Sequence, residues 1–255
     1  MKPVLELQNI DFSYNTLTGE TKALKNVSFD VYAHEFLGII GPSGCGKSTI
    51  LSLISGLLTP TGGIIINHLQ SDSESPAFGY MLQKDHLFEW RSIYKNVILG
   101  PEIHHCLTPE KTGFVQHLLE EYGLAPFKDA RPSQLSGGMR QRAALIRTLA
   151  LSPQMLLLDE PFSALDSQTR LSVSEDIYQI LRKEGKSAIL VTHDISEAIS
   201  FCDRIVVLSK RPGSVKKILD ISLSVAEKTP LKARNAPEFR HYFNELWGEL
   251  HVGTN

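Results

Sequence analysis

The sequence predicts an α/β fold with a mostly parallel sheet, an N-terminal antiparallel β subdomain and an inserted helical subdomain. Near the N-terminus, the runs VLELQNIDFSY and KNVSFDVY alternate apolar and polar residues, as half-buried antiparallel strands do. Further along, the short apolar runs QMLLLDE, SAILVTHD and DRIVVLSK alternate with helical patterns, which is typical of parallel strands joined by right-handed crossovers. Between these parts, residues 86–152 are mostly helical in pattern, which indicates a helical insertion in the α/β core.

The other elements follow from the same patterns. EFLGII is a buried strand that leads through a glycine-rich loop into the helical run KSTILSLISGLL, and GGIIIN and AFGYMLQ are further strands. We expect a main domain over residues 1–210, with its helical subdomain at about 86–152, and a partly helical C-terminal tail over residues 211–255. Helices are expected at 92–100, 109–124, 137–152, 165–185, 195–202 and 237–251.

Composition excludes several classes of protein. The 255 residues are 42% hydrophobic and 21% charged, as in folded globular domains and unlike disordered, collagen-like or coiled-coil chains. A net charge of -2 gives no overall basic field, so we expect no nucleic-acid partner. Cys45, Cys106 and Cys202 have no metal-ligand spacing, which indicates reduced thiols of a cytosolic protein. No apolar run approaches the ~20 residues of a membrane span, so a membrane role requires a partner.

GPSGCGKST, residues 41–49, has the full spacing GxxxxGK[ST] between a predicted strand and a predicted helix. Its glycines leave room for backbone N–H groups to wrap a β-phosphate. Lys47 would reach the β and γ phosphates, and Ser48 could offer its hydroxyl to Mg²⁺. The sequence therefore predicts a P-loop NTPase core, for which a kinase remains an alternative on this loop alone.

MLLLDE ends a predicted buried strand with two acidic residues. Mg²⁺ prefers hard oxygen ligands, so Asp159 would hold a magnesium water, and Glu160 could polarise the water that attacks the γ-phosphate. An isolated Asp-Glu pair is more often a solvated strand edge, but the P-loop and the following PFSALD favour the functional interpretation. The reaction indicated is nucleotide hydrolysis.

A second glycine pair stands in QLSGGMRQR, residues 134–142, after a serine and before a predicted helix, where backbone N–H groups could also meet a phosphate. The motifs GPSGCGKST, LSGGM, MLLLDEP, SALD and VTHD, in this order, resemble those of the nucleotide-binding subunits of ABC transporters. The resemblance covers residues 3–210 and identifies the main domain as an ABC ATPase domain. It implies an ATPase that uses ATP and Mg²⁺.

The resemblance also implies roles for single residues. Tyr14 matches an aromatic that stacks on adenine, Gln83 a glutamine that touches Mg²⁺ and the attacking water, and His193 a histidine that contacts the γ-phosphate. Expected catalytic residues are Glu160, His193, Gln83 and Lys47, and expected metal-binding residues are Ser48, Gln83 and Asp159. The residues expected to bind the nucleotide are Tyr14, Gly41, Pro42, Ser43, Gly44, Cys45, Gly46, Lys47, Ser48, Thr49, Ser136, Gly137, Gly138 and Asp166.

A head-to-tail dimer follows from the same resemblance. The loop at Ser136 of one subunit would cover the γ-phosphate bound to the P-loop of the other, so that each ATP is shared. The partner would be a second ATPase subunit, with a homodimer expected. Asp166 matches a loop that crosses to the opposite subunit, although an N-cap role for it is equally physical. Met139 stands where many relatives have glutamine.

The resemblance further implies integral membrane permease subunits and a peripheral location on the cytoplasmic face of the membrane. EWRSIYKNV is similar to the PW…NV of importer ATPases for nitrate, sulfonates and taurine, with Glu89 in place of the proline. Trp90, with Phe88 beside it, would form part of a groove for a permease helix, or else belong to the subdomain core. An extracytoplasmic solute-binding protein would act indirectly, through the permease.

Two other functions remain as alternatives to an importer of nitrate-, sulfonate- or taurine-type anions or a related small solute. An exporter ATPase would carry the same motifs, but the FEWRS segment argues against it. A soluble ABC protein of translation or DNA repair usually has two cassettes or long coiled-coil insertions, whereas this chain has one cassette and a short helical insertion.

Overall fold

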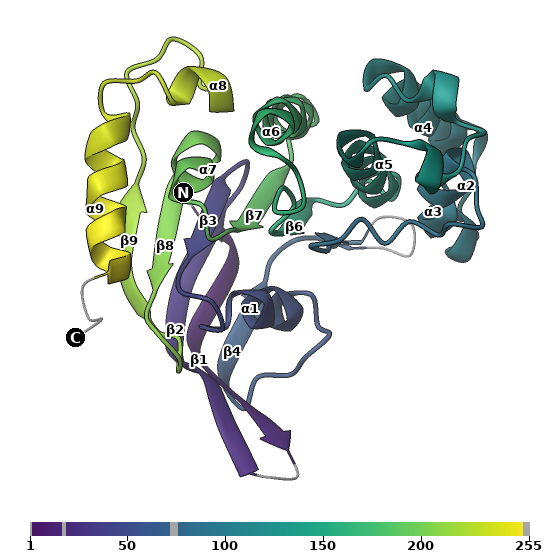
Figure 1. The fold of residues 1–255 in the computed structure, drawn as a ribbon. Coiled ribbons are helices and arrows are strands. Elements are labelled where there is room, and N and C mark those ends of the chain that lie inside the picture. The colour runs from purple at the N-terminus through teal and green to yellow at the C-terminus, as the bar shows by residue number, and fades with distance from the viewer. Residues whose placement is uncertain (1, 17–18, 72–75, 252–255) are drawn as a thin grey trace. The chain divides into compact units, whose positions relative to one another are not determined.

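The structure, a computed structural model, describes residues 2–16, 19–71 and 76–251 (Figure 1). It divides into two compact units. One unit contains the chain up to Leu69 together with the chain from Gly185 onward, and the other contains Gln70–Glu184. The fold is a mixed α/β fold with a mostly parallel sheet and a separate antiparallel sheet, which confirms the predicted fold class. The predicted domain bounds remain predictions.

An antiparallel sheet in the first unit has the strand order β2-β1-β4. Leu5 and Leu7 of β1 are buried as alternating positions, and a register shift between Leu7 and Ile10 changes the phase, so that Ile10 and Phe12 are buried next. Residues 17 and 18, within the predicted turn between the first two strands, lie outside the described residues. The strands are β1 (Pro3–Thr16), β2 (Gly19–Tyr32) and β4 (Gly62–Asn67).

The parallel part of this unit has the strand order β7-β3-β8-β9. Every residue of β3 and β7 is buried, which explains why their sequences are continuous apolar runs. β9 pairs antiparallel with β8 and lies in the predicted tail, where the sequence did not indicate a strand. The strands are β3 (Phe36–Ile40), β7 (Ser187–Val191), β8 (Arg204–Leu208) and β9 (Val215–Asp220), and the helices of this unit are α1 (Lys47–Ile54), α7 (Ile195–Phe201), α8 (Pro230–Ala233) and α9 (Phe239–His251).

The second unit contains the parallel strand pair β5 and β6 and the helices of the insertion. α5 packs against α2, α4 and α6. The single helix expected at 92–100 is two short helices that meet at Ile98. The elements are β5 (Phe78–Met81), β6 (Met155–Asp159), α2 (Ile93–Val97), α3 (Leu99–Ile103), α4 (Pro109–Glu121), α5 (Gly137–Leu149) and α6 (Ser167–Lys183), with 3₁₀ turns at Ala125–Phe127 and Pro132–Gln134.

Polar N-cap residues fix where most of the helices begin. At each of these positions the side-chain oxygen accepts a hydrogen bond from a backbone N–H of the first turn, which stabilises a helix by about 1 kcal/mol. The capping residues are Ser92, Thr108, Ser136, Asp166, Asp194 and Thr229. Within the described ranges, no helix combines the length and apolar character that a membrane crossing requires.

Candidate functional site

The P-loop joins the C-terminal end of β3 to the N-terminus of α1. Gly44 and Gly46 have φ values of 73° and 106°, a region that favours glycine, and Gly46 is the N-cap of α1. A Cβ on Gly46 would also lie 2.5 Å from Leu24 Cδ2, closer than real contacts allow. The backbone conformation therefore requires the motif glycine at 46, and the absence of a side chain also leaves room for Leu24.

Lys47 is buried at the start of α1, and its ammonium group points back into the loop. Its Nζ donates hydrogen bonds to the carbonyl oxygens of Gly41, at 2.8 Å, and Pro42, at 3.1 Å. Ser48 is exposed beside it, at the positive end of the helix dipole. The structure therefore gathers a cation, a hydroxyl and helix N–H groups at one loop, which is the donor set that a phosphate requires.

Tyr14 lies on β1 next to the P-loop helix. Its hydroxyl forms a hydrogen bond of 3.0 Å with Thr49 Oγ1, and its ring meets Phe12 edge to face at a centroid distance of 4.9 Å. The side chain is 42% exposed, so part of the ring surface is open to a base. The structure thus brings the predicted adenine-stacking residue to the predicted phosphate loop.

The acidic pair after β6 lies in the second unit. Asp159 is buried, and its Oδ2 accepts a hydrogen bond of 3.4 Å from the Tyr80 hydroxyl. Glu160 has a φ of 45°, which is uncommon for a residue with a side chain. Gln83 Nε2 donates to Glu160 Oε2 at 3.3 Å and to Ser163 Oγ at 3.4 Å. The predicted catalytic glutamine and glutamate are therefore in contact.

The donor set predicted for magnesium fits that ion by its chemistry. Ser48, Gln83 and Asp159 offer a hydroxyl, an amide oxygen and a carboxylate, all of them hard oxygen ligands. Among the described residues no group of three or more His, Cys, Asp or Glu side chains is arranged for a metal. Mg²⁺ does not require such a cluster, because it keeps several waters and uses one or two protein carboxylates together with substrate phosphates.

The glycine pair of QLSGGMRQR opens α5, with Ser136 as the exposed N-cap. Ser136 Oγ accepts a hydrogen bond of 3.3 Å from the Met139 backbone N–H. A Cβ on Gly138 would lie 3.1 Å from methyl carbons of both Thr169 and Val173 on α6. Packing against α6 therefore favours glycine at position 138, in addition to its predicted contact with a phosphate. The backbone N–H of Met139 stabilises the N-cap.

Asp166 and His193 occupy two further loops. Asp166 caps α6, because its Oδ1 accepts backbone N–H bonds from Gln168 at 3.2 Å and Thr169 at 3.1 Å. Hydrogen bonds from Thr169 and Gln168 hold the pKa of the Asp166 carboxyl below its ordinary value. The N-cap interpretation is thus confirmed, while the role across a dimer stays a prediction. His193 is exposed, two residues after the end of β7.

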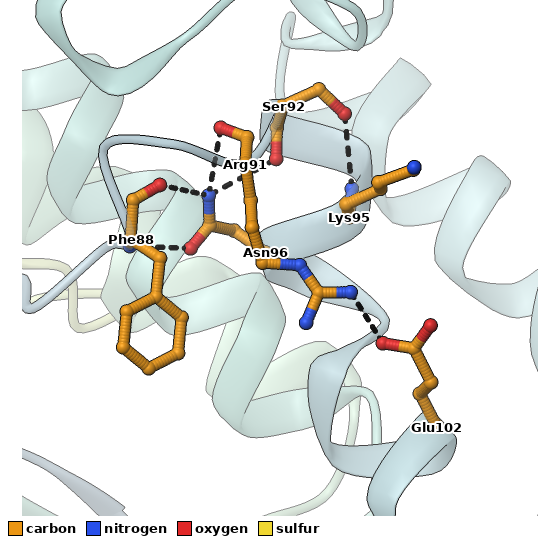
Figure 2. A network of polar contacts seen from close by, with 6 residues as sticks. All are labelled: Phe88, Arg91, Ser92, Lys95, Asn96 and Glu102. Carbon is orange, nitrogen blue, oxygen red and sulfur yellow. Dashed lines mark hydrogen bonds and ion pairs between the residues drawn. The ribbon is translucent and has the colours of Figure 1, made fainter.

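Sequence reasoning missed the residue that shapes the loop before α2. Asn96 is fully buried, and its side chain accepts a hydrogen bond of 2.7 Å from the Phe88 backbone N–H (Figure 2). Its amide donates to the carbonyl oxygens of Phe88, Arg91 and Ser92, at 3.0 to 3.3 Å. One buried amide therefore holds a whole turn of chain. The only sequence signal was the asparagine in the importer-like EWRSIYKNV.

Trp90 stands on this turn and is 71% exposed, with its ring 4.8 Å from that of Phe88 between centroids. The alternative that it belongs to the subdomain core is therefore wrong. Beside it, a surface groove of about 510 Å³ is rich in cationic side chains, and Arg91 is paired with Glu102. The groove is lined by Trp90, Arg91, Ser92, Lys95, Asp129 and Arg131.

Two arginines of α5 hold the chain that follows Gln83. Arg140 Nε lies 3.1 Å from Asp85 Oδ2. Arg147 donates to the carbonyl oxygens of His86, at 2.7 Å, and Asp85, at 2.6 Å. The helix α5, which Ser136 caps, therefore holds the loop that begins at Gln83, a connection that the spacing of these residues in the sequence did not show.

Comparisons with known proteins identify the family of this chain. The family model described as ABC transporter matches residues 24–163. The uncharacterized ABC transporter ATP-binding protein YtlC of Bacillus subtilis (strain 168) is 44% identical, over 96% of this chain and 95% of its own. The nitrate import ATP-binding protein NrtD of a Synechocystis strain is 37% identical over 95% and 93%, and the taurine import ATP-binding protein TauB of Roseobacter denitrificans is 39% identical over 84% and 80%.

A solved structure of an ATP-binding cassette is also similar to this chain. The ATP-binding cassette MJ0796, in a dimeric post-hydrolysis state bound to ADP and Pi, is 31% identical to this chain. It aligns with a TM-score of 0.72 over 86% of this chain and 99% of its own. The cassette fold, the P-loop and the family match agree, and the chain belongs to the ABC transporter family as an ATP-binding ATPase cassette.

Proposed function

We propose that this chain is the ATPase subunit of an ABC importer for nitrate-, sulfonate- or taurine-type anions or a related small solute. One observation carries the proposal: a single short segment has Gln83 at one end, in contact with Glu160, and the exposed Trp90 at the other. A catalytic contact and a surface suited to a partner are thus only a few residues apart. The nitrate and taurine import proteins among the relatives favour an importer over an exporter or a soluble ABC protein.

Residues of the candidate site would carry out nucleotide binding and hydrolysis. The P-loop backbone and Lys47 would hold the phosphates, and the exposed face of Tyr14 would stack on adenine. Ser48, Gln83 and Asp159 would hold Mg²⁺, which when bound neutralises charge on the β- and γ-phosphate oxygens. Glu160 would accept the proton of the attacking water, with Gln83 and His193 orienting water and γ-phosphate.

A dimer completes the site in this proposal. Ser136 is exposed at the N-terminus of α5, where its hydroxyl and the positive helix end would meet the γ-phosphate held by a second ATPase subunit. The dimeric state of the similar cassette MJ0796 supports this arrangement. A second copy of this chain is the proposed partner, and two identical contacts would then form with two-fold symmetry.

Transport would follow from closure of this dimer on ATP and its opening after hydrolysis. The groove beside Trp90 would receive a helix of a separate membrane permease, with the chain peripheral on the cytoplasmic face of the membrane. The loop held by Arg140 and Arg147 would carry the motion between Gln83 and this groove. An extracytoplasmic solute-binding protein would act only through the permease.

Replacement of Glu160 tests the hydrolytic part of the proposal. The Glu160→Gln variant should bind ATP normally, lose phosphate release because the proton acceptor is gone, and accumulate as an ATP-bound dimer. Turnover is measured by phosphate release, and the dimer by light scattering after gel filtration. The matched control is Glu110→Gln, an exposed glutamate in the first turn of α4, which should behave as the wild type. Normal turnover by the Glu160 variant would falsify its assignment as the base.

A further inference from the structure

The turn between β8 and β9, residues 209–214, is joined by backbone hydrogen bonds to the strand β2. The Gly213 backbone N–H donates to the Ala23 carbonyl oxygen at 2.8 Å, and the Lys25 N–H donates to the Gly213 carbonyl oxygen at 2.9 Å. Within the turn, Ser209 Oγ lies within 3.2 Å of hydrogen-bonding partners in Lys210, Pro212 and Ser214. The turn is therefore held in place on two sides.

Gly213 brings this turn against the P-loop itself. A Cβ at position 213 would lie 2.1 Å from the carbonyl oxygen of Cys45 and 3.3 Å from its carbonyl carbon. The φ of Gly213 is outside the left-handed region, so the chain conformation at this position does not require a glycine. Glycine is needed here because the Cys45 carbonyl group occupies the space that a side chain would take.

The contact fixes the orientation of one peptide group of the P-loop. The carbonyl of Cys45 and the N–H of Gly46 belong to the same planar trans peptide and point in opposite directions. Since the carbonyl faces Gly213, the Gly46 N–H faces away from the turn. Leu24 also packs against Gly46, and the Cys45 side chain is buried, so these neighbours restrain the same peptide.

We propose that Gly213 is a positioning residue for nucleotide binding: its turn supports the Cys45–Gly46 peptide and aims the Gly46 N–H at a phosphate of the nucleotide. This inference rests on the proposed function of residues 41–49 as the phosphate-binding loop. A side chain at 213 would have to push the Cys45 carbonyl aside, which would rotate the Gly46 N–H out of line.

The first test is ATP affinity of the full chain. Gly213→Ala should weaken binding of ATP and ADP about tenfold, the value of one charge-assisted hydrogen bond. The matched control is Gly248→Ala on α9, where an added Cβ meets nothing within 4 Å. Binding is measured by calorimetry. The thermal unfolding temperature of each variant is also measured without nucleotide. Equal affinities of the two variants would overturn the inference.

A thiol measurement separates local displacement from general loosening. Cys45, Cys106 and Cys202 are all buried, so all three should react slowly with a maleimide in the wild type. In Gly213→Ala, labelling resolved by mass spectrometry should rise at Cys45 alone, because the added methyl group displaces only its peptide. A rise of similar size at all three cysteines would mean that the variant is merely less stable, and would overturn a positioning role.

Two further variants keep the outcome decisive. If Gly213→Ala does not fold, Ser209→Ala replaces it: loss of the hydroxyl contacts within the turn should lower ATP affinity about threefold, and unchanged affinity overturns the inference.

Lys47→Met separates the proposed phosphate-binding role of residues 41–49 from the proposed positioning role of Gly213. If the wild type and Lys47→Met bind ATP equally, the proposed phosphate loop fails. If Lys47→Met alone loses binding and Gly213→Ala binds as Gly248→Ala does, only the present inference fails.

Discussion

Two loops of this protein carry the predicted chemistry, and they are held in different ways. The P-loop is fixed by its own backbone and by close apolar packing, with Leu24 against Gly46 and Lys47 on loop carbonyl oxygens. The segment from Gln83 to Ser92 is fixed by polar side chains from helices, above all Asn96, Arg140 and Arg147. The first loop depends on glycines in the left-handed region at positions 44 and 46, whereas the second depends on a few hydrogen bonds.

This difference suits what each loop is proposed to do. Backbone N–H groups bind a phosphate well only if they are already aimed at it, so a rigid cradle raises affinity. A loop that transmits motion must instead move with the element that holds it. Hydrogen bonds from α5 and α2 make the second loop follow those helices. Substitutions in the two loops should therefore affect ATP turnover to different degrees.

The largest effect is expected in the P-loop. Lys47→Met should lower ATP affinity about 10- to 100-fold and abolish turnover, because the loop loses its buried cation. Affinity is measured by calorimetry and turnover by phosphate release. The control is Lys128→Met, an exposed lysine of the other unit, which should leave both values unchanged. Turnover near that of the wild type in the Lys47 variant would contradict the assignment of this loop.

An intermediate effect is expected where hydrogen bonds hold the second loop. Asn96→Ala should lower the free energy of unfolding by about 2–4 kcal/mol, since it removes the buried side chain that forms hydrogen bonds with part-buried backbone groups of Phe88, Arg91 and Ser92. Turnover should fall but persist. The measurement is urea unfolding, with Asn235→Ala as the control, because that side chain is exposed and donates a hydrogen bond of 3.4 Å to the Leu231 carbonyl oxygen. A stability loss equal to that of the control would show that the loop does not depend on Asn96.

The smallest effect on ATP turnover is expected at the groove. Trp90→Ala should leave the turnover of the isolated chain within about twofold, because the side chain is mostly exposed and supports little of the fold. Solute uptake by cells and copurification with the permease should nevertheless be lost. Trp247→Ala, an exposed tryptophan on α9, is the matched control and should retain both. Retained uptake in the Trp90 variant would exclude the groove as the permease contact.

Much of the site could be predicted because its signals are local in the sequence. The P-loop spacing, the Asp159-Glu160 pair after an apolar strand and the polar residues that cap helices each depend on a few neighbouring residues. The break between α2 and α3 at Ile98 and the strand β9 were missed. The first is decided by how a short helical segment packs, and the second by pairing with β8.

The sequence by itself determined the fold class, the order of the motifs and the residue types expected to meet a nucleotide, because backbone geometry and motif chemistry are short-range. Only the tertiary structure decided that Trp90 is exposed, that Asn96 holds its loop, and that Gly213 lies against the Cys45 carbonyl. These facts depend on segments distant in sequence that meet only when the chain is packed. Contacts of that kind leave no periodicity or spacing to read beforehand.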